Sequence, residues 1–413
     1  MTEAVLYDFT DGLARITLNR TDARNALNIA MCEALVVATR RAREDGARCV
    51  LVRALGPVFC AGADLKERQG MGDDAVRARR LKSFAAYDAL ERLPMPAIAV
   101  VEGPAVGSGV EIAAACDFII ATPAASFRTP EALWGTVGAT QRLPRIIGVE
   151  NALNVMLGGE PVPVKMFAKA PLFDAIVDQD VIAAAVAVAE KSAAARAAGK
   201  VLPRIRDIRV REPDLEGVLQ YARNTAKTAF KDYPAPLAII DCVQAAATKR
   251  FDDGLAEEQR LFKGLYISDV SAALRHVFFA ERATSRVDGL PKDVKPRPIE
   301  SVAIIGAGTM GTGIAINFLN AGIRTRLLEL GQEALDRGVA RIRATYEGQV
   351  KKGKLDESKL AARMALLEPV LDYSGIATSD LAIEAVFEDM AVKEKVFKTL
   401  DATLKPGAIL ATN

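Results

Sequence analysis

The stretch EGPAVGSGVEIAAACDFIIATPAASFRTPE, residues 102–131, decides the fold of the first part of the chain. Three glycines crowd its start and good helix formers follow, which predicts a glycine-rich turn leading into a helix that carries Glu111. An apolar strand is predicted at 117–121, and a second carboxylate, Glu131, comes soon after it. A helix N-terminus presents unpaired N–H groups that can hold an oxyanion, and a nearby glutamate can move a proton. The stretch therefore predicts an acid–base site.

The flanking sequence predicts strands alternating with helices. A second small-residue turn, VFCAGADLKE at 58–67, directly follows a predicted strand at 49–53. The other predictions are a hairpin over 4–18 with Asp11-Gly12 at its turn, helices over 28–39 (capped by Asn28), 72–91 and 151–198, and a strand at 96–101. This alternation indicates an α/β fold.

Composition narrows the class of protein. A chain of 413 residues is too long for one ordinary core, so two or three domains are expected. The net charge of +2, from 54 basic and 52 acidic residues, gives no electrostatic footprint for nucleic acid. The five cysteines have no metal-ligand spacing, and their apolar surroundings suggest free thiols in a reducing compartment. No signal pattern or membrane span is apparent. We expect a cytoplasmic protein without a metal.

Four motifs occur in a familiar order: ITLNRTDARNALN at 16–28, FCAGADLKE at 59–67, EGPAVGSGVEIA at 102–113 and TQRLPR at 140–145. Together they resemble the crotonase, or enoyl-CoA hydratase/isomerase, superfamily. The resemblance implies a crotonase-type ββα spiral domain over 1–198. It also implies addition of water to a trans-2-enoyl-CoA, giving a 3-hydroxyacyl-CoA in fatty-acid β-oxidation.

The resemblance also implies roles for particular residues. The backbone N–H groups of Ala63 and Ser108 would stabilise the charge on the thioester oxygen. Glu111 and Glu131 would hold the water, one as base and one as acid. The positions that match CoA contacts in the family are Arg24, Ala61 and Lys66.

Two departures from the family pattern concern this site. The family usually has a glycine where this chain has Ser108, and the loop after Glu131 is about two residues shorter, at Thr136–Thr140. The loop bears directly on the placement of Glu131.

A second domain is predicted over 299–413. A buried strand at 301–305 precedes GAGTMG at 306–311, a helix follows at 312–321, and a second strand at 324–329 ends in an acid. That context predicts a Rossmann doubly wound fold that binds NAD, with Glu329 disfavouring NADP. Residues 381–393 resemble the 3-hydroxyacyl-CoA dehydrogenase family. The predicted NAD-binding residues are Gly306, Gly308, Thr309, Met310, Gly311, Glu329, Glu388 and Lys393.

Residues 199–298 are predicted to be a helical linker and connector, and the whole chain resembles the start of a bifunctional enoyl-CoA hydratase/3-hydroxyacyl-CoA dehydrogenase. We expect the dehydrogenase part to be incomplete, because the chain ends at Asn413 in a late strand and its one histidine, His276, lies upstream of the nucleotide fold. The expected partners are acyl-CoA substrates, with thiolase or self-association as further possibilities.

Two other functions stay open at this point. One is a Δ3-Δ2-enoyl-CoA isomerase, in which Glu131 shuttles a single proton and no water is needed. The other is a catalytically silent module that binds acyl-CoA or NAD, which predicts stabilisation by ligand without turnover. Tolerance of Glu111→Gln would separate isomerase from hydratase.

Overall fold

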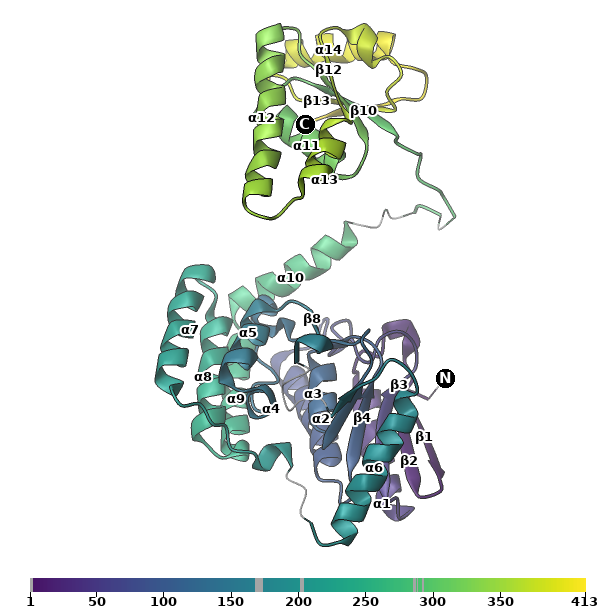
Figure 1. The fold of residues 1–413 in the computed structure, drawn as a ribbon, viewed down its shortest axis with the longest axis vertical. Helices are drawn as coiled ribbons and strands as arrows, with labels where there is room; N and C mark the ends of the chain where they lie inside the picture. The colour runs from purple at the N-terminus through teal and green to yellow at the C-terminus, as the bar shows by residue number, and fades with distance from the viewer. Residues whose placement is uncertain (1–2, 168–173, 201–203, 285–286, 288, 292) are drawn as a thin grey trace. The chain divides into compact units, whose positions relative to one another are not determined.

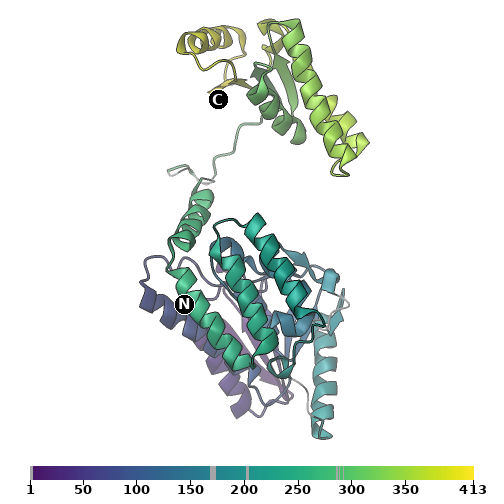
Figure 2. The same ribbon diagram turned by 90° about the vertical axis from the view of Figure 1, so that its left-hand side faces the viewer.

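The computed structural model describes residues 3–167, 174–200, 204–284, 287, 289–291 and 293–413. The chain divides into two compact units, Met1–Val287 and Asp288–Asn413, which are drawn in Figures 1 and 2. The division falls at the start of the stretch rich in proline and lysine that precedes the second domain.

Two sheets organise the described part of the first unit. The larger has the order β1-β2-β3-β4-β6-β9, in which only the β1–β2 pair is antiparallel; its strands are β1 (Val5–Thr10), β2 (Leu13–Leu18), β3 (Cys49–Ala54), β4 (Ala97–Val101), β6 (Phe118–Ala121) and β9 (Ala175–Ile176). The smaller contains β5 (Ala105–Val106), β7 (Ser126–Arg128) and β8 (Val162–Pro163). The hairpin predicted at Asp11-Gly12 is confirmed. Both turn residues have positive φ, as a tight hairpin turn requires.

The central strand β4 shows why this sheet is covered on both faces. Ala97, Ala99 and Val101 belong to one core, whereas Ile98 and Val100 belong to another, because side chains alternate across a strand. The helix α6 (Val181–Ala197) covers the second face with Ala185 and Ala189, four positions apart (Figure 1). A strand buried on both sides is the pattern expected of a parallel sheet.

The other face carries the helices that build the site. They are α1 (Ile29–Glu44), α2 (Asp73–Glu91), α3 (Ser108–Ala114), α4 (Leu143–Ile147) and α5 (Val149–Gly158). The predicted cap of α1 is confirmed, since the Asn28 side chain accepts a hydrogen bond from the Met31 N–H at 2.9 Å. The continuous helix predicted over 151–198 is wrong between α5 and α6, where β8 and β9 pair with the two sheets instead.

Helices of the predicted linker pack onto the first unit. They are α7 (Leu215–Ala229), α8 (Pro234–Thr248), α9 (Phe251–Tyr266) and α10 (Asp269–Ala283), and the first three lie side by side in Figure 2. Leu219, Ile239 and Phe262, one from each of α7, α8 and α9, are buried in the same core as α1 and α3. This stretch is helical as predicted, and α7–α9 share the hydrophobic core of the first unit.

The second unit has a five-stranded parallel sheet of order β12-β11-β10-β13-β14. Its elements are β10 (Ser301–Ile305), α11 (Thr309–Asn320), β11 (Arg324–Leu328), α12 (Gln332–Lys351), α13 (Glu357–Met364), β12 (Leu367–Val370), β13 (Leu381–Glu384), α14 (Met390–Thr403) and β14 (Ile409–Thr412). In chain order this arrangement is 3-2-1-4-5, which confirms the predicted Rossmann doubly wound fold.

No helix in the described ranges is long and apolar enough to cross a membrane. The same residues contain no cluster of His, Cys, Asp or Glu suited to a metal ion.

Candidate active site

Two glycine-containing turns meet at the N-terminus of α3. A Cβ on Gly109 would lie 2.6 Å from the Cys60 carbonyl oxygen, and one on Gly62 would lie 3.0 Å from that of Val106. The Val106 N–H also donates to the Cys60 carbonyl at 2.9 Å. Only residues without a side chain let the two backbones approach so closely. The sequence motifs at 59–67 and 102–113 therefore become one surface.

This surface presents the two predicted oxyanion donors. Ser108 is the first residue of α3, so its N–H has no acceptor within the helix. Ala63 forms a β-bridge with Leu27. In this bridge the Gly62 carbonyl accepts from the Leu27 N–H and the Asp64 N–H donates to the Leu27 carbonyl, so the N–H of Ala63 points away from Leu27. Ala63 and Ser108 line the same pocket, which is compatible with the predicted role of their N–H groups.

Glu111 lies on α3, one turn from Ser108, and is only 6% exposed. One carboxylate oxygen accepts the Ala139 N–H at 2.7 Å, and the other accepts from the Arg142 guanidinium at 2.8 Å. Arg142 is itself buried and also pairs with Glu91 at 3.3 Å. A guanidinium and a backbone N–H thus hold the two oxygens of Glu111 in place by hydrogen bonds.

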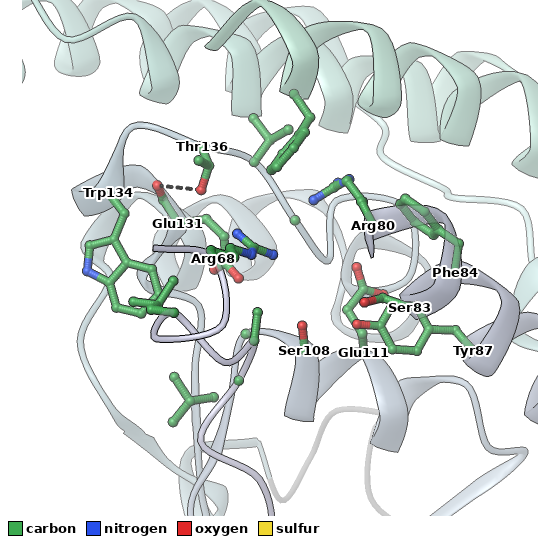
Figure 3. A pocket seen from close by; sticks show the side chains of 18 residues that line it. Arg68, Arg80, Ser83, Phe84, Tyr87, Ser108, Glu111, Glu131, Trp134 and Thr136 are labelled. Atoms are coloured by element: carbon green, nitrogen blue, oxygen red, sulfur yellow. Dashed lines mark hydrogen bonds between the residues drawn. The ribbon is translucent and has the colours of Figure 1, made fainter. Parts of the chain in front are cut away.

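Glu131 comes from the 3-10 helix Pro130–Trp134 and faces Glu111 across the pocket (Figure 3). A Cβ on Gly107 would lie 2.6 Å from the Glu131 Oε1 atom, so this glycine makes room for the carboxyl group. The Oε2 atom of Glu131 is buried without a hydrogen-bond partner among the described residues. Burial, reinforced by the charge of Glu111, raises the pKa of Glu131 to about 7. This carboxyl can therefore hold a proton near neutral pH.

The shortened loop after Glu131 completes the pocket. Gly138 lies against the Glu131 side chain, and the next residue, Ala139, has φ +60° and donates its N–H to Glu111. A left-handed alanine is strained, so the surrounding contacts hold it in place. The structure thus brings Glu111 and Glu131 to one pocket despite the departure from the family pattern.

The predicted CoA-binding residues lie outside the pocket wall. The Ala61 N–H donates to the carbonyl of Arg24 at 3.0 Å, so these two residues are neighbours at the turn that precedes Ala63. Lys66 follows in the same turn with an exposed side chain, and Arg24 is exposed as well. The turn thus presents two cations to solvent next to the oxyanion site.

Several pocket residues were missed by sequence reasoning. Arg142 belongs to the quoted motif TQRLPR, but no residue pattern there indicated its pairing with Glu111. Arg68 and Arg80 line the pocket, and neither was among the predicted site residues. Glu258 of α9 is 1% exposed and lies beside the pocket loop, where it accepts from Thr140 Oγ1 at 2.6 Å.

In the second unit the glycine turn packs directly against the helix that follows it. Gly306 has φ +105°, and a Cβ on Gly311 would lie 1.9 Å from the Gly306 carbonyl oxygen, so the turn and helix α11 touch directly. Gly308 caps α11, which starts at Thr309, and Met310 is exposed. A Cβ-free cradle at a helix N-terminus suits a pyrophosphate.

The predicted acids of the second unit are also placed. Glu329 follows β11, and its Oε2 accepts the Ala307 N–H at 3.1 Å. Lys393 on α14 pairs with Glu388 at 3.0 Å and with the buried Glu384 at 3.6 Å. Glu384, which sequence reasoning missed, ends β13 and accepts from Thr412 Oγ1 at 2.7 Å. All these groups lie at the carboxyl end of the parallel strands, where such folds bind ligands.

Comparisons with known proteins agree with both motif sets. Residues 8–263 match the family model for enoyl-CoA hydratase/isomerase, and residues 301–413 match that for the NAD-binding domain of 3-hydroxyacyl-CoA dehydrogenase. A glyoxysomal fatty acid beta-oxidation multifunctional protein of Cucumis sativus is 32% identical over 98% of this chain and 57% of its own length. A peroxisomal bifunctional enzyme of Danio rerio is 32% identical over 97% of this chain and 55% of its own length.

Among solved structures, an enoyl-CoA hydratase/isomerase from Xanthobacter autotrophicus Py2 is 28% identical, with a TM-score of 0.46 over 70% of this chain and all of the other. The chain spans little more than half the length of the curated relatives it matches. The resemblance inferred from four motifs is thus confirmed: the chain belongs to the enoyl-CoA hydratase/isomerase family and carries, after it, the NAD-binding domain of a 3-hydroxyacyl-CoA dehydrogenase.

Proposed function

We propose that the first unit adds water to trans-2-enoyl-CoA thioesters to give 3-hydroxyacyl-CoA. The observation that carries this proposal is the pair of glutamates on one pocket, of which Glu111 is held by Arg142 and Glu131 has a buried, unbonded oxygen. Because the two neighbouring carboxyl groups have different surroundings, we assign the hydrogen-bonded Glu111 as the base and Glu131 as the acid.

The geometry assigns each group a step. Water bound between the glutamates gives a proton to Glu111, and its oxygen bonds to the β carbon of the enoyl group. The thioester oxygen then gains negative charge, which the N–H groups of Ala63 and Ser108 stabilise. Glu131, with a pKa of about 7, delivers a proton to the α carbon. One water is thereby added across the double bond, and proton exchange with solvent restores the glutamates.

We also propose that the second unit binds NAD in preference to NADP. The glycine cradle at Gly306 and Gly311 suits a pyrophosphate, and Glu329, which bonds the Ala307 N–H of the same turn, would bond a ribose 2′-hydroxyl and repel a 2′-phosphate. Glu388 and Lys393 would border the nicotinamide side. NAD held there would supply a hydride acceptor suited to the oxidation of 3-hydroxyacyl-CoA, the product of the first unit.

A second activity, isomerisation between Δ3- and Δ2-enoyl-CoA, is supported by one observation. Glu131 has a carboxyl oxygen free of hydrogen bonds and a pKa of about 7, which suits a group that removes and returns a single proton. This reaction needs no activated water, so it should survive Glu111→Gln better than hydration does.

For the cellular setting we propose acyl-CoA substrates, a cytoplasmic location and, as macromolecular partners, thiolase or a second copy of the chain. Five free cysteines that are all buried support a reducing compartment. The two β-oxidation relatives are named for glyoxysomes and peroxisomes, so fractionation of the native cells against markers of each compartment decides the location.

The test of the proposed function is a spectrophotometric assay of the purified chain with crotonyl-CoA and with a longer enoyl-CoA. Loss of the enoyl absorbance together with formation of 3-hydroxyacyl-CoA is expected. Conversion of a Δ3-enoyl-CoA without hydration would identify an isomerase. Thermal stabilisation by both thioesters with no turnover would instead identify a binding module and overturn the proposal.

A further inference from the structure

Three consecutive loop residues each contact a different glutamate. Gly138 lies against Glu131, since a Cβ on it would be 3.3 Å from the Glu131 Oε1 atom. The Ala139 N–H donates to Glu111 at 2.7 Å, and Thr140 donates to Glu258. Two of these acids belong to the proposed mechanism, whereas Glu258 comes from α9, more than 100 residues further along the chain.

Glu258 is tied to this loop by both of its oxygens. Its Oε2 atom accepts from the Thr140 hydroxyl at 2.6 Å and from the Thr140 N–H at 3.3 Å. Its Oε1 atom pairs with Arg80 at 2.8 Å. With 1% exposure, a carboxylate at this place is costly to bury unless such partners compensate its charge. Because the Glu258 carboxylate needs these three interactions to be buried, it can in turn hold Thr140 and Arg80 in place.

Arg80 links Glu258 to the pocket from the other side. It lies on α2, its guanidinium packs 3.6 Å from the centre of the Phe262 ring on α9, and it lines the pocket beside Glu111 (Figure 3). The network therefore joins α2, α9 and the 138–140 loop around the two catalytic glutamates. Without Glu258, Thr140 loses its acceptor and Arg80 loses its counter-charge.

We propose that Glu258 is a positioning residue of this active site: it fixes the 138–140 loop through Thr140 and thereby sets the distance between Glu111 and Glu131. The inference rests on the proposed hydratase function and deepens it. A displacement of about 1 Å at a catalytic group can lower a rate about a hundredfold. The left-handed Ala139 next to Thr140 is the point at which the loop would relax.

The charges around Glu131 give the proposal a second measurable consequence. The groups that act on it are Glu111 from α3 and Glu258 from α9, which raise its pKa, and Arg80 from α2, which lowers it. Removing the negative charge of Glu258 therefore lowers the pKa of Glu131. Because Glu131 must be protonated to donate, hydration should then be lost at a lower pH than in the unaltered protein.

The experiment compares Glu258→Gln with Thr140→Val and with the double variant, using crotonyl-CoA. In Glu258→Gln the amide oxygen accepts from Thr140 more weakly than a carboxylate and no longer balances the charge of Arg80. We therefore expect kcat to fall by about tenfold or more with KM changed by less than about twofold, and the alkaline limb of the pH profile to move to lower pH. Thr140→Val keeps the side-chain volume and every charge, so kcat should fall without a shift of that limb. The double variant should lose less than the product of the two single losses, because both act through one contact.

The matched control is Glu257→Gln. Glu257 precedes Glu258 on α9 but pairs with Arg260 at the surface, and this change should leave kcat and the pH profile unaltered. Unchanged kcat and pH profile in Glu258→Gln would overturn the inference. If Glu258→Gln does not fold, an unchanged kcat in Thr140→Val overturns it equally. Absence of hydration by the unaltered protein would instead refute the proposed function, so the two failures are distinguishable.

Discussion

In the first unit, Glu111, Glu131 and Glu258 come from three separate elements and meet at one loop in the protein interior. In the second unit, Glu329 lies within 25 residues of the glycine turn that it bonds, and it remains partly exposed. The first site is thus made by long-range packing, whereas the glycine turn and Glu329 of the second unit belong to one local strand–turn–helix–strand motif. Desolvation accordingly raises the pKa of Glu131 in the first unit, whereas the close approach of backbone at the glycine turn shapes the site in the second.

The largest effect is expected when each proposed catalytic carboxyl is replaced by an amide, which can neither accept nor deliver the proton. Glu111→Gln and Glu131→Gln should each lower hydration of crotonyl-CoA by roughly a thousandfold, as expected when a general acid or base is lost. Binding of a saturated acyl-CoA, measured by calorimetry, should stay close to that of the unaltered protein. Glu150→Gln, an exposed change in the same unit, is the control. Near-normal hydration by either variant would show that its role is assigned incorrectly.

The next test compares ion pairs of the two units. Arg142→Met leaves the buried Glu111 without its counter-charge and leaves Glu91 with only Arg206, at 3.5 Å, so the free energy of unfolding of the first unit should fall by about 3 kcal/mol or more. Arg324→Met breaks an exposed pair with Glu368 and should cost the second unit less than about 1 kcal/mol.

Unfolding of the first unit can be followed by fluorescence of Trp134, the single tryptophan of the chain, and that of the whole chain by circular dichroism. Equal losses of unfolding free energy in Arg142→Met and Arg324→Met would contradict the difference in burial between the two ion pairs.

A third test uses the pKa of Glu131, which is raised from 4.5 to about 7. The folded state then binds this proton more tightly than the unfolded state. Its contribution to stability is therefore complete below about pH 4.5 and is lost as the pH rises through 7. The loss is on the order of 3 kcal/mol for the first unit. Glu131→Gln should abolish this contribution, so Trp134 fluorescence melts should show the variant gaining stability over the unaltered protein as the pH rises. An identical pH dependence in both proteins would disprove the shift.

The smallest effect is expected for cofactor choice in the second unit. Glu329→Gln removes the repulsion of a 2′-phosphate, and the preference for NADH over NADPH should fall by about tenfold, or 1.4 kcal/mol. Calorimetric titration with the two cofactors measures this ratio, with the fully exposed Glu333→Gln on α12 as control. Tighter binding of NADPH by the unaltered protein would reverse the assignment of Glu329.

The sequence by itself determined the α/β class, the hairpin at Asp11-Gly12, the nucleotide fold and the candidate pair Glu111 and Glu131. Each of these follows from residues that are close in sequence, such as a glycine turn before a helix or an acid at the end of a strand. The motif order then indicated the family, since four short patterns in sequence constrain one fold.

Tertiary structure alone decided how the first site is completed. The pairing of Arg142 with Glu111, the bond from Glu258 to Thr140 and the packing of α7–α9 into the core join residues far apart in the chain. A glutamate in an amphipathic helix looks like a solvated side chain until its neighbours are known. Tertiary structure also decides the pKa of Glu131, because burial by surrounding elements raises it and no local sequence pattern predicts that burial.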